Sequence, residues 1–162
     1  MVESETGWGG GNGQVILVPH TARSILLSEF DGWEGAVGVK VLVVEDSKFL
    51  RVSTERVLAA AGYQVVSAGD GVEALRMARQ ELPALILLDV MLPKMSGPDV
   101  LKALKNDAAT AGIRVMMLTG LSQKNAKALE KDGAAGFFEK SDGMLGSGTD
   151  SLLAAIEKVL KK

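Results

Sequence analysis

From Lys40 to the C-terminus, short apolar runs rich in β-forming residues alternate five times with segments whose apolar residues have helical spacing. The apolar runs are residues 41–44, 64–68, 84–88, 113–118 and 135–138. The helical segments are residues 48–61, 72–80, 98–106, 124–131 and 150–160. Runs that are apolar on both sides suit strands covered on both faces, and right-handed crossovers between them give a parallel sheet. The pattern predicts a doubly wound α/β fold: a five-stranded parallel sheet of flavodoxin-like order 2-1-3-4-5 with helices on both faces.

Composition divides the chain near residue 39. A chain of 162 residues that is 47% hydrophobic has the length for one well-buried core of roughly 100 to 150 residues and a smaller appendage. We expect the main domain to cover residues 40–162. Residues 1–39 are a glycine-rich N-terminal extension that is weakly structured or docks on another surface; translation that begins near Val37 is the alternative. Within this extension, residues 14–18 suit a short strand and residues 21–30 about two helical turns.

Charge and composition narrow the classes of function. The formal net charge is −2, which argues against direct binding of nucleic acid or of a membrane surface. The chain has no cysteine, which removes disulfide and thiolate chemistry and fits a reducing compartment. No run approaches the roughly 20 apolar residues that span a bilayer, so membrane insertion is not expected. We therefore expect a cytoplasmic protein.

Five polar side chains each fall just past one of the apolar runs: Glu45, Asp46, Asp89, Thr119 and Lys140. Because the carboxyl ends of parallel strands meet at one edge of the sheet, we expect these groups to lie together. Three close carboxylates repel one another, and their repulsion raises the pKa of at least one of them unless a cation offsets it. Mg²⁺ is the cation that this oxygen donor set favours, with Asp46 and Asp89 as direct ligands and Glu45 acting through water.

The same constellation suits the transfer of a phosphoryl group. A carboxylate can attack phosphorus to form an aspartyl phosphate when cations neutralise the transferring oxygens, and Asp89 is the expected nucleophile. Lys140 would contact one phosphoryl oxygen as a second cation, and Thr119 would donate its hydroxyl to another. Gly120 follows Thr119 without a side chain, which leaves room for the phosphoryl group to enter.

The motifs around these residues resemble the receiver domain of two-component response regulators. The matching segments are Val-Leu-Val-Val-Glu-Asp-Ser at 41–47, Leu-Leu-Asp-Val-Met-Leu-Pro at 87–93 with Gly97, Leu-Thr-Gly at 118–120 and Phe-Phe-Glu-Lys at 137–140. The resemblance covers residue 40 to the C-terminus. It implies that Asp89 accepts phosphate from a histidine kinase or a histidine phosphotransfer protein, and that the backbone carbonyl of Met91 completes the ligands of the metal. It also implies a signalling protein whose only enzymatic activities are its own phosphorylation and dephosphorylation.

Two positions depart from the family pattern. Family members usually have proline, often in a cis bond, where this chain has Ser141, and a non-proline cis bond costs about 2.5 to 4 kcal/mol. We therefore expect a trans bond and a different placement of Lys140. Many relatives have tyrosine where this chain has Phe138, so an inward swing of this ring on the movement of Thr119 would bring no hydroxyl. Thr119 and Phe138 are the expected switch residues.

The resemblance implies a phosphorelay that ends on a protein partner. No output domain fits after Leu160, so we expect a single-domain response regulator that signals by contact with a downstream protein, by phosphate relay, or through a further piece; a homodimer stays open. One alternative is a pseudo-receiver, a binding module that never takes phosphate. Another is an aspartate-nucleophile phosphatase, but such enzymes usually need a second acid two residues after the nucleophile, where this chain has Met91.

Overall fold

The chain divides into two compact units, Met1–Gly35 and Ala36–Lys162. The computed structural model describes residues 15–16, 25–26, 38–120, 126–140, 146 and 148–162. Within these residues, no helix has the length and apolar character that a crossing of a membrane requires. The loop expected at 141–148 lies mostly outside the described residues. Residues 14, 17–18, 21–24, 27–30 and 124–125 of the predicted elements also lie outside them.

The described part of the first unit is a pair of two-residue strands. Strand β1 (Val15–Ile16) pairs antiparallel with β2 (Ile25–Leu26), so that Val15 faces Leu26 and Ile16 faces Ile25. The strand predicted over residues 14–18 is confirmed at Val15–Ile16. The helical turns predicted over residues 21–30 are wrong at Ile25–Leu26. A helix of this length is marginal in water, and β-branched residues such as isoleucine favour strands.

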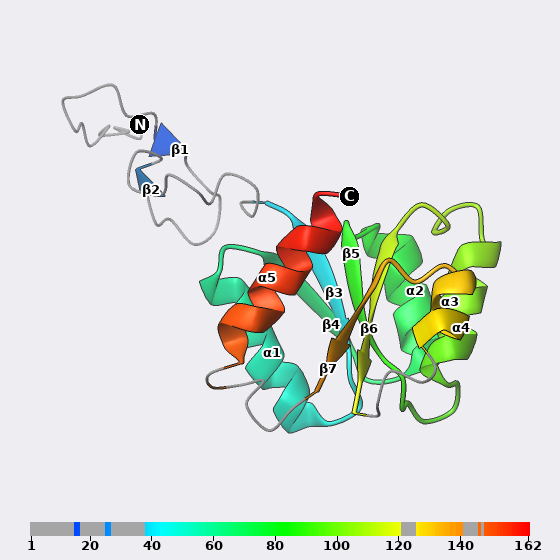
Figure 1. Cartoon of the computed structure of the whole chain (residues 1–162). Coiled ribbons are helices and arrows are strands. Elements are labelled where there is room, and N and C mark those ends of the chain that lie inside the picture. Colours follow the sequence, from blue (N-terminus) through cyan, green and yellow to red (C-terminus); the bar gives the residue numbers. More distant parts are fainter. Residues whose placement is uncertain (1–14, 17–24, 27–37, 121–125, 141–145, 147) are drawn as a thin grey trace. The chain divides into compact units, whose positions relative to one another are not determined.

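The second unit contains the predicted parallel sheet. Its strands are β3 (Lys40–Val44), β4 (Gln64–Ala68), β5 (Leu85–Asp89), β6 (Arg114–Thr119) and β7 (Gly136–Glu139). They pair in the order β4-β3-β5-β6-β7, all in parallel, which is the predicted order 2-1-3-4-5 counted from Lys40 (Figure 1). Each observed strand lies within one residue of its predicted bounds at either end. The doubly wound fold class is confirmed.

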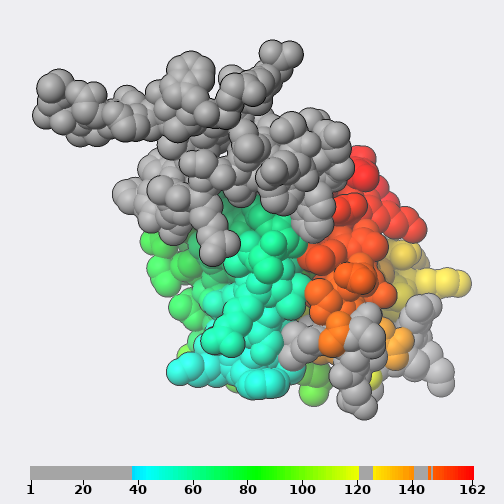
Figure 2. All heavy atoms as spheres, turned by 90° about the vertical axis from the view of Figure 1, so that its left-hand side faces the viewer, coloured from blue at the N-terminus to red at the C-terminus, as the bar shows by residue number. Residues whose placement is uncertain are grey.

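Helices cover both faces of this sheet. They are α1 (Lys48–Ala60), α2 (Gly71–Glu81), α3 (Gly97–Asn106), α4 (Ala126–Lys131) and α5 (Thr149–Leu160). Helices α1 and α5 pack on one face and cover it side by side in Figure 2, while α2, α3 and α4 pack on the other face (Figure 1). The predicted helices over 48–61, 72–80, 98–106 and 150–160 are each confirmed to within one residue at either end.

Alternation along the central strands builds two cores. In β3, Val41 and Val43 belong to the core beneath α1 and α5, whereas Leu42 and Val44 belong to the core beneath the other three helices. All four side chains are fully buried. Burial of a side chain of this size stabilises the fold by about 1.5 to 3 kcal/mol. Both faces of the sheet are therefore packed against helices, and this packing holds in place the strand ends that carry the site residues.

Polar caps begin the helices that follow the first three of these strands. Ser47 accepts a hydrogen bond from the Leu50 amide at the start of α1, and Asp70 accepts one from the Glu73 amide at the start of α2. Ser96 accepts one from the Asp99 amide at the start of α3. Each cap satisfies an amide that the helix leaves unpaired, typically worth about 1 kcal/mol. The caps place the first turns of these helices at the carboxyl edge of the sheet.

Candidate functional site

Strand register brings the predicted site residues to one edge of the sheet. Val44 lies opposite Leu88 in the pairing of β3 with β5, so Glu45 and Asp89 follow at adjacent strand ends. Asp89 and Thr119 are the last residues of β5 and β6, whereas the sequence predicts them one position past the ends of these strands. The Lys140 amide donates to the Thr119 carbonyl oxygen at 2.7 Å, which places the end of β7 beside them.

Three carboxylates form a cluster at this edge. Oxygen atoms of Glu45, Asp46 and Asp89 all lie within 4.8 Å of one another. Glu45 and Asp89 are buried, with 4% and 5% of their surface exposed, whereas Asp46 is exposed. Oxygen-only donors with one open side are what a hard divalent cation such as Mg²⁺ prefers. The donor set therefore fits the predicted cation site.

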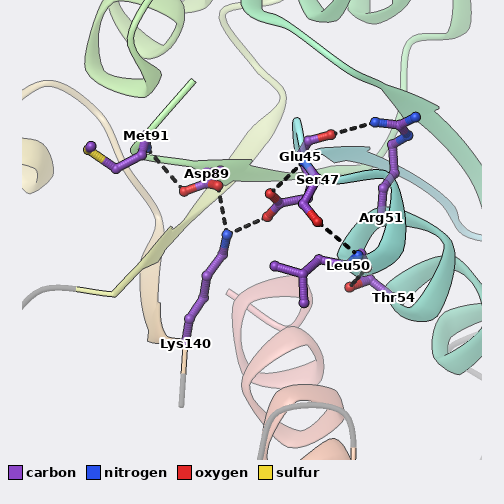
Figure 3. Close-up of polar contacts among 8 residues, drawn as sticks. All are labelled: Glu45, Ser47, Leu50, Arg51, Thr54, Asp89, Met91 and Lys140. Carbon is purple, nitrogen blue, oxygen red and sulfur yellow. Dashed lines mark hydrogen bonds and ion pairs between the residues drawn. The ribbon is translucent and has the colours of Figure 1, made fainter. Parts of the chain in front are cut away.

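Lys140 lies between the two buried carboxylates. Its Nζ donates to Asp89 Oδ2 at 2.6 Å and also to Glu45 Oε2, and its side chain is 18% exposed (Figure 3). The lysine reaches the cluster from the end of β7, on the opposite side of β5 and β6 from Glu45. Its contact with Asp89 agrees with the placement that the sequence predicts. The additional contact with Glu45 was not predicted.

Burial and this lysine shift the ionisation of the cluster. Burial raises the pKa of Glu45 above its ordinary value of 4.5, and the charge of Asp89 adds to the increase, while Lys140 opposes it. Burial alone lowers the pKa of Lys140, but its hydrogen bonds to Asp89 and Glu45 outweigh burial and raise the pKa above 10.5. Lys140 therefore stays protonated at neutral pH. The predicted increase in a carboxylate pKa occurs at Glu45, although burial contributes more than repulsion does.

Backbone amides two residues further along hold both buried carboxylates. The Ser47 amide donates to Glu45 Oε1 at 3.1 Å, and the Met91 amide donates to Asp89 Oδ1 at 3.1 Å (Figure 3). Amide donors to a carboxylate favour its ionised form. The Met91 side chain is 70% exposed, so it is the backbone of Met91 that serves the site. The loops after β3 and β5 thus orient the two acids in the same way.

Gly97 supports Asp89 from behind. The Gly97 amide donates to the Val90 carbonyl oxygen at 3.0 Å, and a Cβ atom on Gly97 would lie only 2.2 Å from the carbonyl oxygen of Asp89. Only glycine permits such a close approach of α3 to the end of β5. The glycine that belongs to the matched motif thus sets the position of the Asp89 backbone.

The remaining predicted residues lie around this centre. Thr119 is half-buried at the end of β6, and a Cβ atom on the neighbouring Gly120 would meet no atom of the described residues within 4 Å. Phe138 is half-buried and packs against the core beneath α1 and α5, so its predicted switching role stays a prediction. Ser141 lies outside the described residues.

Arg51 is a site residue that the sequence reasoning missed. Its Nη1 donates to the backbone carbonyl oxygen of Glu45 at 2.8 Å. The sequence feature that could have identified it is an arginine near the start of the helix that follows the acid pair. Side chains on a helix tilt toward its N-terminus, so an arginine there can reach back to the end of the preceding strand. A basic residue there is ordinary on a surface helix, so the pattern alone does not distinguish the two roles.

Comparison with known proteins identifies the family of this chain. Residues 41–145 match the model of the response regulator receiver domain. The chain shares 34% identity over 125 residues with the DNA-binding dual master transcriptional regulator RpaA of Synechocystis, a match that covers 76% of this chain and 49% of that protein. It shares 40% identity over 90 residues with the alkaline phosphatase synthesis transcriptional regulatory protein PhoP of Bacillus subtilis, covering 56% and 37%.

Solved structures give the same result. The chemotaxis response regulator CheY4 of Vibrio cholerae superposes with a TM-score of 0.68 at 31% identity, over 76% of this chain and 99% of that one. The response regulator domain of CheB from Thermotoga maritima gives a TM-score of 0.69 at 27% identity, over 77% and 98%.

The chain belongs to the response regulator receiver domain family of two-component systems, whose members are signalling phosphoacceptors. It spans about a third to a half of the length of the curated relatives that it matches. Those relatives are transcriptional regulators by name.

Proposed function

We propose that this protein is a Mg²⁺-dependent phosphoacceptor and that Asp89 takes a phosphoryl group from a histidine kinase or a histidine phosphotransfer protein. The observation that carries the proposal is the setting of Asp89. Its buried carboxylate lies within 4.8 Å of two further carboxylates and receives a hydrogen bond from Lys140 at 2.6 Å. A buried acid with a permanent cation and an open cation site meets the requirements for nucleophilic attack on phosphorus.

The donor set supports specific roles for the acids. Asp46 and Asp89 would hold Mg²⁺ directly, with Glu45 acting through water and the backbone carbonyl of Met91 completing the protein ligands. When bound, the cation neutralises negative charge on the oxygens of the transferring phosphoryl group. The exposure of Asp46 gives the cation a way in from solvent.

The transfer forms one bond and breaks another. An oxygen of the Asp89 carboxylate donates an electron pair to phosphorus, and the bond from phosphorus to the imidazole nitrogen of the donor breaks. The electrons of that bond leave with the donor imidazole. Lys140 offers its charge to a phosphoryl oxygen, and Thr119 offers its hydroxyl to another. The chain supplies no general acid for a small leaving group at position 91, where Met91 stands, which disfavours a metabolite phosphatase.

Phosphorylation adds about two negative charges to the site and favours one of two conformations that already exist. We propose that Thr119 and Phe138 take part in this shift, and that a downstream protein, or a second copy of this chain, recognises the altered surface. The receiver domain covers residues 40–162 in this proposal, and residues 1–39 are a separate extension. The single-domain form and signalling by protein contact belong to the same proposal.

Acetyl phosphate tests this function directly. We expect intact-mass measurement to show one added phosphoryl group on the wild-type protein in the presence of Mg²⁺ and none when EDTA replaces Mg²⁺. Asp89→Asn should stay unmodified. Asp150→Asn, a change of the same charge at an exposed acid in the first turn of α5, should be modified like the wild type. A folded wild-type protein that takes no phosphate under saturating Mg²⁺ would instead favour the pseudo-receiver, which Ser141 and Phe138 make the second candidate.

A further inference from the structure

Arg51 connects α1 to the backbone of the acid pair. It lies in the second turn of α1, and its guanidinium reaches back toward the end of β3, where Nη1 donates to the Glu45 carbonyl oxygen at 2.8 Å (Figure 3). The Arg51 side chain is half-buried along this path, and its own amide donates to the Ser47 carbonyl oxygen at 2.9 Å. The arginine is therefore fixed at both its backbone and its tip.

The bond from Arg51 completes the restraint on the Glu45 backbone. The Glu45 amide donates to the Ala68 carbonyl oxygen of β4 at 3.1 Å, so its other polar backbone atom was already held. A peptide group is planar, and fixing a carbonyl therefore fixes the amide and Cα of the next residue. The next residue is Asp46, the exposed acid of the cluster, and no side chain or amide of the described residues donates a hydrogen bond to its carboxylate. Arg51 thus governs the direction in which Asp46 leaves the strand.

The space that the Arg51 guanidinium occupies depends on Gly69. Its Nη1 would lie 3.3 Å from a Cβ atom on Gly69, a tight contact, so the absence of a side chain there gives the arginine its room. The Gly69 amide donates to Glu73 Oε2 at 2.9 Å, which holds this turn against α2. In the part of the chain that the structure describes, Arg51 forms no ion pair. The Arg51 guanidinium therefore donates to a neutral carbonyl and not to a carboxylate.

We propose that Arg51 is a positioning residue for the divalent-cation site, which acts by orienting the peptide between Glu45 and Asp46. The inference rests on the proposed function, since it assigns a residue to the site that phosphorylation requires. Two effects of the arginine oppose each other. Its positive charge repels a nearby cation and weakens cation binding, whereas its hydrogen bond orients a ligand and strengthens binding. The sign of the change on its removal therefore reveals which effect dominates.

The test measures Mg²⁺ binding to the whole chain by isothermal titration calorimetry, with MgCl₂ alone as the titrant. Arg51→Met removes both the charge and the hydrogen bond at nearly constant length. We expect it to weaken Mg²⁺ binding about tenfold, which is the lower end of what the loss of a partner behind a metal ligand costs. Arg51→Lys, which keeps the charge and a donor on a side chain of different geometry, should recover part of the affinity.

Arg56→Met is the matched control, because Arg56 lies on the same helix, is exposed and carries the same charge. It should bind Mg²⁺ like the wild type. Melting curves without metal accompany each variant, and if Arg51→Met is unfolded at the assay temperature, Arg51→Lys against Arg56→Lys decides, with several-fold weaker binding expected for the former.

The outcomes separate the inference from the proposed function. Unchanged or tighter Mg²⁺ binding by folded Arg51→Met, with a wild-type protein that binds Mg²⁺ and is phosphorylated, overturns the positioning role and leaves the phosphoacceptor function intact. A wild-type protein that binds no Mg²⁺ overturns both. Weaker binding by Arg51→Met together with equally weak binding by Arg56→Met also overturns the inference, because the loss would then not depend on the hydrogen bond to Glu45.

Discussion

Replacing Gly97 by alanine places a methyl group against the backbone that carries Asp89. The added Cβ would lie 2.2 Å from the Asp89 carbonyl oxygen and 2.7 Å from the Val90 Cα, and these contacts must lengthen to at least 3.0 Å. Both neighbours are backbone atoms, so no side chain can rotate away. Overpacking of this kind costs about 1 to 3 kcal/mol of the free energy of unfolding. In an open helical position the same substitution would stabilise the protein by about 0.5 to 1 kcal/mol, so the two arguments predict opposite signs.

Gly112→Ala is the matched control, because a Cβ atom there would meet no atom within 4 Å in the part of the chain that the structure describes. Urea unfolding of both variants should show Gly97→Ala to be less stable than the wild type and Gly112→Ala to be unchanged or slightly more stable. Displacement of the Asp89 backbone should also slow labelling by acetyl phosphate at least about tenfold, since errors of about 1 Å in placement can cost more than that. If Gly97→Ala proves as stable as Gly112→Ala and is labelled at the wild-type rate, the close approach of α3 does not position Asp89.

Three further substitutions test the surroundings of the site. Lys140→Met removes the cation between two buried carboxylates, so the free energy of unfolding in EDTA at neutral pH should fall by about 2 to 4 kcal/mol; an unchanged urea midpoint would contradict the geometry. Gly71→Ala brings a Cβ within 2.7 Å of Val100 Cγ2, so its melting temperature should be lower than that of Gly112→Ala. Asp107 makes an ion pair with Arg79 at 2.6 Å that holds its pKa below 3.8. Its contribution is present above that pH and is lost as the pH falls through the lower folded value, so Asp107→Asn should unfold at lower urea than the wild type at neutral pH and at equal urea in strong acid.

The parallel sheet could be predicted from the sequence because its central strands are apolar on both sides. That pattern has one solution, which is burial between two layers of helices, and it fixed the strand bounds to within one residue. The residues at the carboxyl ends then followed from topology alone. Asp89 and Lys140 meet because β5 and β7 both flank β6, although the two residues are 51 positions apart in the chain.

Contacts that depend on side-chain reach could not be predicted in the same way. The sequence places Lys140 near Asp89, but only the geometry shows that the same ammonium also donates to Glu45. The clash that makes Gly97 necessary arises from the approach of two backbones, which no local pattern encodes. At Ile25–Leu26, apolar spacing over a short segment suited a helix, and pairing with the preceding strand β1 prevailed.

The residue that becomes covalently modified tests the central claim most directly. After reaction with acetyl phosphate and Mg²⁺, reduction with borohydride converts an aspartyl phosphate to the corresponding alcohol, and peptide mass spectrometry then locates it. We predict a single site of reduction at Asp89. Modification at another acid such as Asp46, or no modification at all of a folded and Mg²⁺-saturated protein, would contradict the account.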